Sequence, residues 1–328
     1  MEMKKCLQRA IGICGAVIGA GFATGQEIVS FFSMSGGWSW LGIAVAVLLI
    51  GGLGQALIRT AARGRTAELA QLCTPAWRMP CRLMFGCLTV CTGGAMLAGA
   101  AELAALIFPW MHAALLGWIA TLGIGVLMSF RQEGNLSRLS GVLLVLLLIL
   151  MAVCWRFPSQ LAAVLRTRPP HLLPAAARAL CWGGMNLAIA APLLCQEHDE
   201  RVPVAAAGLL LVLLLLGNGL MLRNPGVWGS ELPLIALLAQ LGRPGQLLGA
   251  AALYAAMLTT LLACLRGLRS MLPEHRGVPG LFLPPLLIAL LSLVGFRGMV
   301  GKVYPALGAA CLFILCTALH TAEKTGQA

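Results

Sequence analysis

The chain has 328 residues, of which 59% are hydrophobic and 10% are charged, and its formal net charge is +12. Soluble domains carry roughly 25% charged residues, so this composition excludes a soluble globular protein and predicts a polytopic membrane protein. The Lys and Arg residues lie almost wholly in short connections between apolar runs. This placement favours contact with the lipid bilayer and its headgroups over binding to nucleic acid.

Ten apolar runs are long enough to cross a bilayer at about 20 residues each. The expected transmembrane helices cover residues 8–32, 38–58, 83–108, 112–130, 137–156, 175–196, 203–222, 246–268, 280–296 and 300–320. The first run imitates a secretory signal because Lys4 and Lys5 precede it, but Gln26 and Glu27 interrupt it and nine further spans follow. A retained first span is therefore the favoured interpretation. The shorter run 231–241 is expected to form a short helix at the surface.

The distribution of basic residues predicts the topology. With the N-terminus inside, 15 Lys and Arg residues fall on the cytoplasmic side and 8 outside, so both termini are expected in the cytoplasm of a multi-pass inner (cell) membrane protein. The single domain 1–328 divides into two halves of five spans, 8–156 and 175–321, joined by the connector 157–174. An odd number of spans per half gives the halves opposite orientations, as in an inverted repeat.

The first span contains an unusual sequence, "GAVIGAGFATGQE" at residues 15–27. Its glycines lower the cost of leaving helical dihedral angles, and unwound backbone within hydrocarbon is tolerated only where protein, water or a ligand satisfies it. We predict a half-helix ending near Val17, an open segment at 18–23 and a second half-helix from Thr24. Thr24 and Glu27 would form a capping box at this restart.

Close helix packing is the alternative for this stretch. Gly15 to Gly19 and Gly21 to Gly25 are both GxxxG spacings, which commonly let two helices approach one another. The polar residues of the stretch and a similar feature in the sixth span favour a binding site. That span reads "ALCWGGMNLAIAAPLLCQ", with Gly183, Gly184, Asn186 and Pro192 in mid-run. Such a pair of interrupted helices is typical of a transporter binding site.

The broken helices suggest which ligands would bind. A helix that restarts inside the membrane presents a positive end that suits a substrate carboxylate, and the preceding half-helix ends in carbonyls that suit sodium. Glu27 and Glu102 are acidic groups well inside predicted spans, where burial is costly enough to suggest function. Alternatively, Glu27 serves only as a helix cap and has no role in binding. Glu102 has interfacial exposure as its alternative to gating or amine recognition.

Two threonines in the eighth span add candidate oxygen ligands. Thr259 and Thr260 could simply bond back to their own helix, as hydroxyls do in many membrane helices. Beside a broken first span they could also ligate sodium, because hard cations take oxygen donors.

Together these features resemble the LeuT-like fold of the amino acid–polyamine–organocation superfamily. More narrowly, "GAVIGAGFATGQE" with "NLAIAAPLL" is similar to the YkvI family of bacterial membrane proteins. The resemblance implies an all-α architecture of about ten transmembrane helices in a five-plus-five inverted repeat, with helices 1 and 6 broken and substrate held between spans 1, 3, 6 and 8. With Thr24 and Glu27 added, the expected substrate-binding residues are Gly19, Ala20, Gly21, Phe22, Thr24, Glu27, Gly184, Met185 and Asn186.

The resemblance also implies a tentative sodium site between spans 1 and 8. The carbonyls of Gly15 and Ile18 would join the hydroxyls of Thr259 and Thr260. Sodium-coupled members of several related families carry Ser or Asn around these positions, whereas this chain has Ala16 and Val17, so the coupling ion stays open. No other cofactor is expected.

The leading functional hypothesis is a secondary active transporter that moves a small amino acid or related solute by alternating access, with sodium and protons as candidate coupling ions. The alternative is a membrane sensor that binds the same solute without transporting it. An enzyme is not expected, because Asp199 is the single aspartate and lies in a loop, and no catalytic arrangement is visible. Nothing resembles a channel filter. The substrate, transport direction and oligomeric state are not specified by the sequence.

Overall fold

The computed structural model describes residues 2–64, 69–130, 136–157, 159–161, 172–272 and 277–324, and the regular secondary structure in this part of the chain is all helical. The main helices are α1 (Glu2–Val17), α2 (Ala20–Ala23), α3 (Gln26–Phe31), α4 (Ser39–Gly64), α5 (Leu69–Leu72), α6 (Pro75–Ile107), α7 (Ala113–Ser129), α8 (Leu136–Cys154), α10 (Leu172–Leu194), α11 (Arg201–Arg223), α12 (Pro233–Leu238), α13 (Gly242–Ser270), α14 (Gly277–Ser292), α15 (Phe296–Gly298) and α16 (Tyr304–Lys324). The short segments η1 (Ser33–Trp38), η2 (Pro225–Val227), η3 (Ala239–Leu241) and η4 (Met299–Val303) connect them. Most of the predicted connector 157–174 lies outside the described residues.

Among the described residues, six helical segments are long and apolar enough to cross a membrane, which makes this a multi-pass membrane protein. They are Ser33–Gly64, Pro75–Ile107, Leu172–Leu194, Arg201–Arg223, Pro233–Ser270 and Phe296–Ala322. Each matches one of the apolar runs expected from the sequence, and the apolar helices Ala113–Ser129 and Phe282–Ser292 are shorter. The full set of ten spans and the inverted repeat stay predictions.

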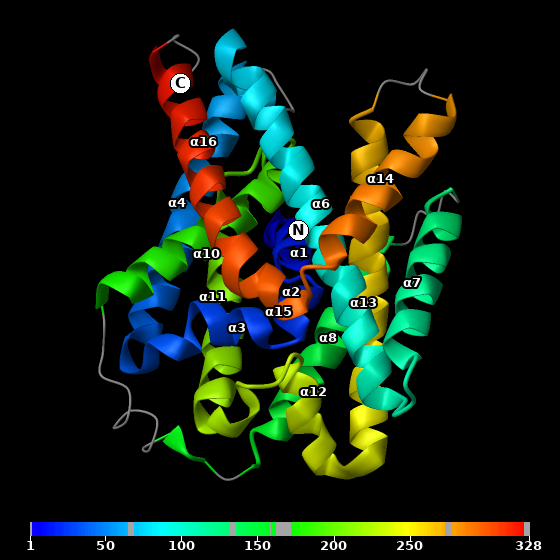
Figure 1. The fold of residues 1–328 in the computed structure, drawn as a ribbon. Helices are drawn as coiled ribbons and strands as arrows, with labels where there is room; N and C mark the ends of the chain where they lie inside the picture. Colours follow the sequence, from blue (N-terminus) through cyan, green and yellow to red (C-terminus); the bar gives the residue numbers. More distant parts are fainter. Residues whose placement is uncertain are drawn as a thin grey trace.

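The first helical segment, made of α1, α2 and α3, lies near the middle of the view in Figure 1, and its residues 21–29 are all buried. One group of packed helices contains α4, α10, α11 and α16, and another contains α6, α7, α13 and α14. Helix α1 packs against α8, α10 and α11, whereas α2 packs against α6 and α13. The chain therefore passes from one group of helices to the other between α1 and α2.

The sixth predicted span forms one continuous helix, α10, so the predicted break in helix 6 is wrong. Its glycines are packing positions. A Cβ atom on Gly184 would lie 2.6 Å from the Gly308 carbonyl oxygen in α16, and a Cβ on Gly308 would collide with the Cys181 carbonyl. Gly183 faces α4 in the same manner. Pro192 falls in the last turn of α10, and the helix continues past it to Leu194.

Helix α12 lies in the region expected to form a short surface helix. The length was predicted correctly, but the location was wrong, because Leu234, Ile235, Leu237 and Leu238 are each at most 3% exposed. Apolar side chains on several sides are typical of a helix buried within the protein. As described below, its first turn contacts the interruption in the first helical segment.

A buried hydrogen-bonded cluster holds the turn that follows α3. The Ser33 hydroxyl donates to Asn218 Oδ1 at 2.9 Å, and Asn218 Nδ2 donates to the Ser39 hydroxyl at 2.9 Å. All three side chains are fully buried. Because each polar group has a partner, the cluster fixes α11 against the junction of η1 and α4 without an unsatisfied group.

Candidate functional site

The first helical segment, from α1 to α3, is interrupted twice. Helix α1 ends at Val17, as predicted, and Ile18 and Gly19 lie outside any helix. The chain then forms the single turn α2, where the sequence predicted open backbone throughout 18–23. A second interruption follows at Thr24 and Gly25, and Gly25 adopts φ 81°. Glycine suits this position because it has no Cβ to oppose a left-handed conformation.

The first interruption leaves backbone acceptors free at the end of α1. The Ile18 N–H still donates to the Cys14 carbonyl at 2.7 Å, and the next such bond runs from the Ala23 N–H to the Gly19 carbonyl at 3.2 Å. Within the described residues, the carbonyls of Gly15 and Ile18 accept no backbone hydrogen bond. Unpaired carbonyls at this depth require another partner such as water or a cation.

The glycine spacings can now be separated into two kinds. A Cβ atom on Gly15 would meet nothing within 4 Å, and one on Gly19 would meet only Thr260 Oγ1, at 3.9 Å. This spacing is therefore not a packed helix–helix contact. A Cβ on Gly25 would instead crowd Met221 and Pro233, so that glycine serves close packing against α11 and α12.

Thr24 supports the second interruption, although not as the predicted capping box. Its hydroxyl donates to the Gly21 carbonyl at 2.6 Å and accepts the Gln26 N–H at 3.1 Å. The residue at the N-cap of α3 is Gly25, which makes no side-chain cap bond. The capping-box prediction is wrong because the Glu27 side chain turns back towards Gly21. The Thr24 carbonyl accepts the Leu234 N–H of α12 at 2.9 Å.

Glu27 is a buried carboxylate in the middle of this arrangement and is 6% exposed. Its Oε2 accepts a hydrogen bond from Trp182 Nε1 in α10 at 3.2 Å. Its carboxyl group packs so closely on Gly21 that a Cβ there would collide with Oε1. The ion pairs of the described residues join Arg9 to Glu197 and Arg59 to Glu200, and none involves Glu27.

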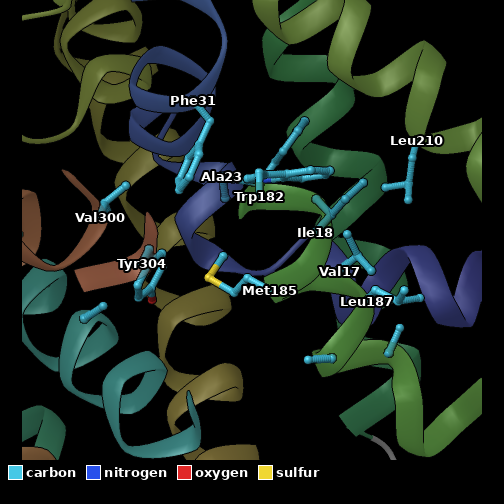
Figure 2. Packing of buried hydrophobic residues seen from close by; sticks show 14 of the residues in the cluster. Val17, Ile18, Ala23, Phe31, Trp182, Met185, Leu187, Leu210, Val300 and Tyr304 are labelled. Atoms are coloured by element: carbon cyan, nitrogen blue, oxygen red, sulfur yellow. The ribbon is translucent and has the colours of Figure 1, made fainter. Parts of the chain in front are cut away.

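Two further polar groups near Glu27 were not among the residues selected from the sequence. Tyr304 is 2% exposed, and its hydroxyl oxygen is buried beside Thr92. Gln26 Oε1 is also buried without a partner. Figure 2 shows the side chains of Phe31, Trp182, Met185 and Tyr304 gathered around this segment. The sequence feature that could have pointed to Tyr304 is the scarcity of tyrosine, since the chain has 2 tyrosines.

The predicted contributors from α10 are only partly brought to the site. Asn186 donates through Nδ2 to the Trp182 carbonyl at 2.9 Å, one turn earlier in its own helix. Met185 is buried on the same helix. Gly184 packs on α16, where a Cβ atom would meet Gly308 and Leu312. Sequence reasoning selected the neighbours of Trp182 but missed Trp182 itself.

Other predicted residues occupy different surroundings. Phe22 is 1% exposed in α2, and its carbonyl accepts the Gly25 N–H at 3.0 Å; Ala20 begins the same turn. Glu102 lies near the C-terminal end of α6 and is exposed. Its role in gating or amine recognition stays a prediction.

The hydroxyls proposed for sodium both bond to their own helix. Thr259 and Thr260 each donate to the Ala256 carbonyl at 2.9 Å, which confirms the back-bonding interpretation. Donation leaves the hydroxyl oxygens able to ligate a cation, and Thr260 faces Gly19 across the interruption. With the free carbonyls of Gly15 and Ile18, the donor set is all oxygen and fits a hard cation by ligand type.

The chain was compared with known proteins. No protein-family profile matches it. It is 25% identical over 331 residues to the uncharacterized membrane protein YkvI of Bacillus subtilis (strain 168), and the match covers 94% of each chain. The solved structure of Mhp1 in its inward-facing conformation aligns with a TM-score of 0.58 and 14% identity, over 93% of this chain and 74% of that chain. The similarity establishes the fold: this multi-pass membrane protein has the LeuT-type fold of Mhp1.

Proposed function

We propose that this protein is a secondary active transporter that carries a small amino acid or related solute by alternating access across a bacterial inner membrane. The observation that supports it most strongly is the double interruption of the first helical segment inside a LeuT-type fold. Free carbonyls at the end of α1 and a buried carboxylate at Glu27 lie along this segment. Polar groups at this depth are costly unless a function retains them.

The proposed coupling ion is sodium or a proton. The all-oxygen set from Gly15, Ile18, Thr259 and Thr260 supports sodium by donor type, and Glu27 supports a proton because it is a buried carboxylate without an ion-pair partner. Both termini are proposed to be cytoplasmic. The ion pair from Arg9 to Glu197 at 2.7 Å agrees with a common side for the N-terminus and the α10–α11 connection.

Uptake by the purified protein in liposomes tests the proposal. A panel of radiolabelled amino acids is offered with sodium and proton gradients imposed separately, and saturable, gradient-dependent accumulation is expected. Gly19→Val should reduce flux strongly because its side chain would enter the interruption beside Thr260. Gly12→Val is the matched control, since a Cβ there meets nothing within 4 Å. Saturable binding without any flux would contradict transport and favour the sensor.

A further inference from the structure

A cluster of buried cysteines lies where the α5–α6 connection meets α10 and α16. Its members are Cys73 just before α6, Cys81 in the second turn of α6, Cys195 just after α10 and Cys311 in α16. Each is at most 5% exposed, and Cys195 and Cys311 are close enough to act electrostatically on Cys81. Helices α5, α6 and α16 pack against one another here. Thiols from four segments of the chain therefore gather around Cys81.

Cys73 and Cys81 are the two members in direct contact. The Cys81 thiol donates a hydrogen bond to the Cys73 sulfur, and the Cys73 thiol donates to the Leu69 carbonyl at 3.7 Å. Both are free thiols. Sulfur atoms in hydrogen-bonding contact need only a small movement to form a disulfide. Pro80 favours that movement, because it has no N–H and leaves the first turns of α6 with one hydrogen bond fewer.

The surroundings make Cys73 the more reactive member of the pair. It lies two residues before Pro75, at the N-terminal end of the 33-residue helix α6, where the helix dipole favours a thiolate. Arg78 lies in the first turn of that helix, and its Nε donates to the Cys73 carbonyl at 3.4 Å. The hydrogen bond from Cys81 and the charge of Arg78 lower the pKa of the Cys73 thiol, although burial acts in the opposite direction. The thiolate is the form that attacks an oxidant.

Burial and geometry restrict what can react with these thiols. Cys73 is 3% exposed and Cys81 is 0% exposed, so the oxidant that fits is small and uncharged, as hydrogen peroxide is. Thiolates also attract soft metal ions. Among the described residues, however, no three His, Cys, Asp or Glu side chains are placed to hold a metal ion, so a tetrahedral zinc site has no support here.

We propose that Cys73 and Cys81 form a redox modification site that hydrogen peroxide converts into a disulfide. The Cys73 thiolate attacks one peroxide oxygen, the O–O bond breaks and hydroxide leaves, which gives a sulfenic acid. The Cys81 thiol then attacks the Cys73 sulfur and displaces its oxygen as water. Two thiols and one peroxide thus give one disulfide and two waters, because the sulfurs lose the two electrons that the peroxide gains. The basic residues of the α5–α6 connection favour the cytoplasmic side, where a reducing environment keeps the pair as thiols at rest.

Peroxide treatment of the purified full-length protein tests the inference, with thiol blocking under denaturing conditions and peptide mass spectrometry as the readout. Because trypsin cleaves after Arg78, the two cysteines fall on separate peptides, and their disulfide appears as a linked pair that dithiothreitol separates. The linked pair should form about tenfold or more faster than Cys14 is oxidised, because Cys73 has the greater thiolate fraction. Cys14 is a buried thiol that donates to the Ala206 carbonyl at 3.3 Å.

Two variants separate the roles of the pair. In Cys81→Ser the sulfenic acid at Cys73 has no resolving thiol, so it should accumulate and react with dimedone. Cys73→Ser should abolish both the disulfide and this adduct. Cys195→Ser is the matched control, because it changes a neighbouring buried thiol and should leave the linked pair unchanged.

Three results would overturn the inference. They are a disulfide that joins Cys81 to Cys195 or Cys311, the lack of a linked pair at peroxide concentrations that oxidise Cys14, and the lack of a dimedone adduct in Cys81→Ser. The readout is thiol chemistry alone and does not depend on flux. The inference therefore stands or fails independently of the transport proposal.

Discussion

Gly21 is expected to be required by the side chain of Glu27 rather than by its own backbone. Its conformation lies within the helical turn α2 and its φ is not positive, so alanine is compatible with the backbone. The added Cβ would collide with Glu27 Oε1 and lie 2.8 Å from Cδ and 3.3 Å from Cγ. The carboxyl group must move away, because carbon atoms in contact are separated by about 3.5 Å or more.

The cost of that movement can be worked out from its one hydrogen bond. The Trp182 Nε1 to Glu27 Oε2 distance is 3.2 Å, at the upper end of the normal range, so displacement breaks the bond. Losing a buried hydrogen bond costs about 1–3 kcal/mol, and an off-rotamer Glu27 adds about 1 kcal/mol. Greater helix propensity returns about 0.5–1 kcal/mol. The net expectation for Gly21→Ala is a loss of about 2 kcal/mol, or a few degrees in apparent unfolding temperature.

Thermal unfolding followed by tryptophan fluorescence in detergent provides the assay. Gly12→Ala in α1 is the matched control and should be neutral or slightly stabilising, since its Cβ meets nothing within 4 Å. In a Glu27→Ala background the collision disappears, so Gly21→Ala should then cost almost nothing. The double-mutant cycle should give a coupling of about 2 kcal/mol. Equal losses with and without Glu27, or no loss at all, would refute the reasoning.

Three further variants probe other contacts. Gly308→Ala should destabilise the protein by about 1–3 kcal/mol in the same assay, because its Cβ would collide with the Cys181 carbonyl; an unchanged unfolding temperature would contradict the close α10–α16 contact. Arg9→Glu should lower the free energy of unfolding by about 1 kcal/mol at low salt, and adding Glu197→Arg should restore it. A loss that is the same at high salt and is not restored by the second substitution would rule out the ion pair. Thr260→Val should raise the sodium concentration for half-maximal uptake about tenfold through loss of an oxygen ligand; unchanged dependence in flux assays would remove Thr260 from the sodium site.

Local sequence was informative where the chain leaves helical geometry. The glycines around Val17 indicated the end of α1, and the polar residues after them indicated a buried site. Gly183 and Gly184 carry the same composition but sit in the continuous helix α10. The difference is tertiary: neighbouring helices fill the space over these two residues, whereas the space over Gly15 is open. Composition alone does not reveal which neighbour a glycine accommodates.

The partners of Glu27 show a second limit. The carboxylate was recognisable from its cost within a membrane, and its adjacency to Thr24 suggested a cap. The structure instead joins it to Trp182, 155 positions away along the chain. Contacts at such separation depend on helix packing, so no local pattern specified that Trp182 or Tyr304 would be there.

The hydrogen bond from the Leu234 N–H to the Thr24 carbonyl joins α12 to the second interruption of the first helical segment. Helix α12 continues through η3 into α13, and α13 carries Thr260, which faces Gly19. The two interruptions of the first segment are thus linked twice, once through α2 and once through α12 and α13. Displacement of either interruption is therefore transmitted to the other through α12 and α13 as well as through α2. The segment should respond to a ligand as one mechanical unit instead of two independent hinges.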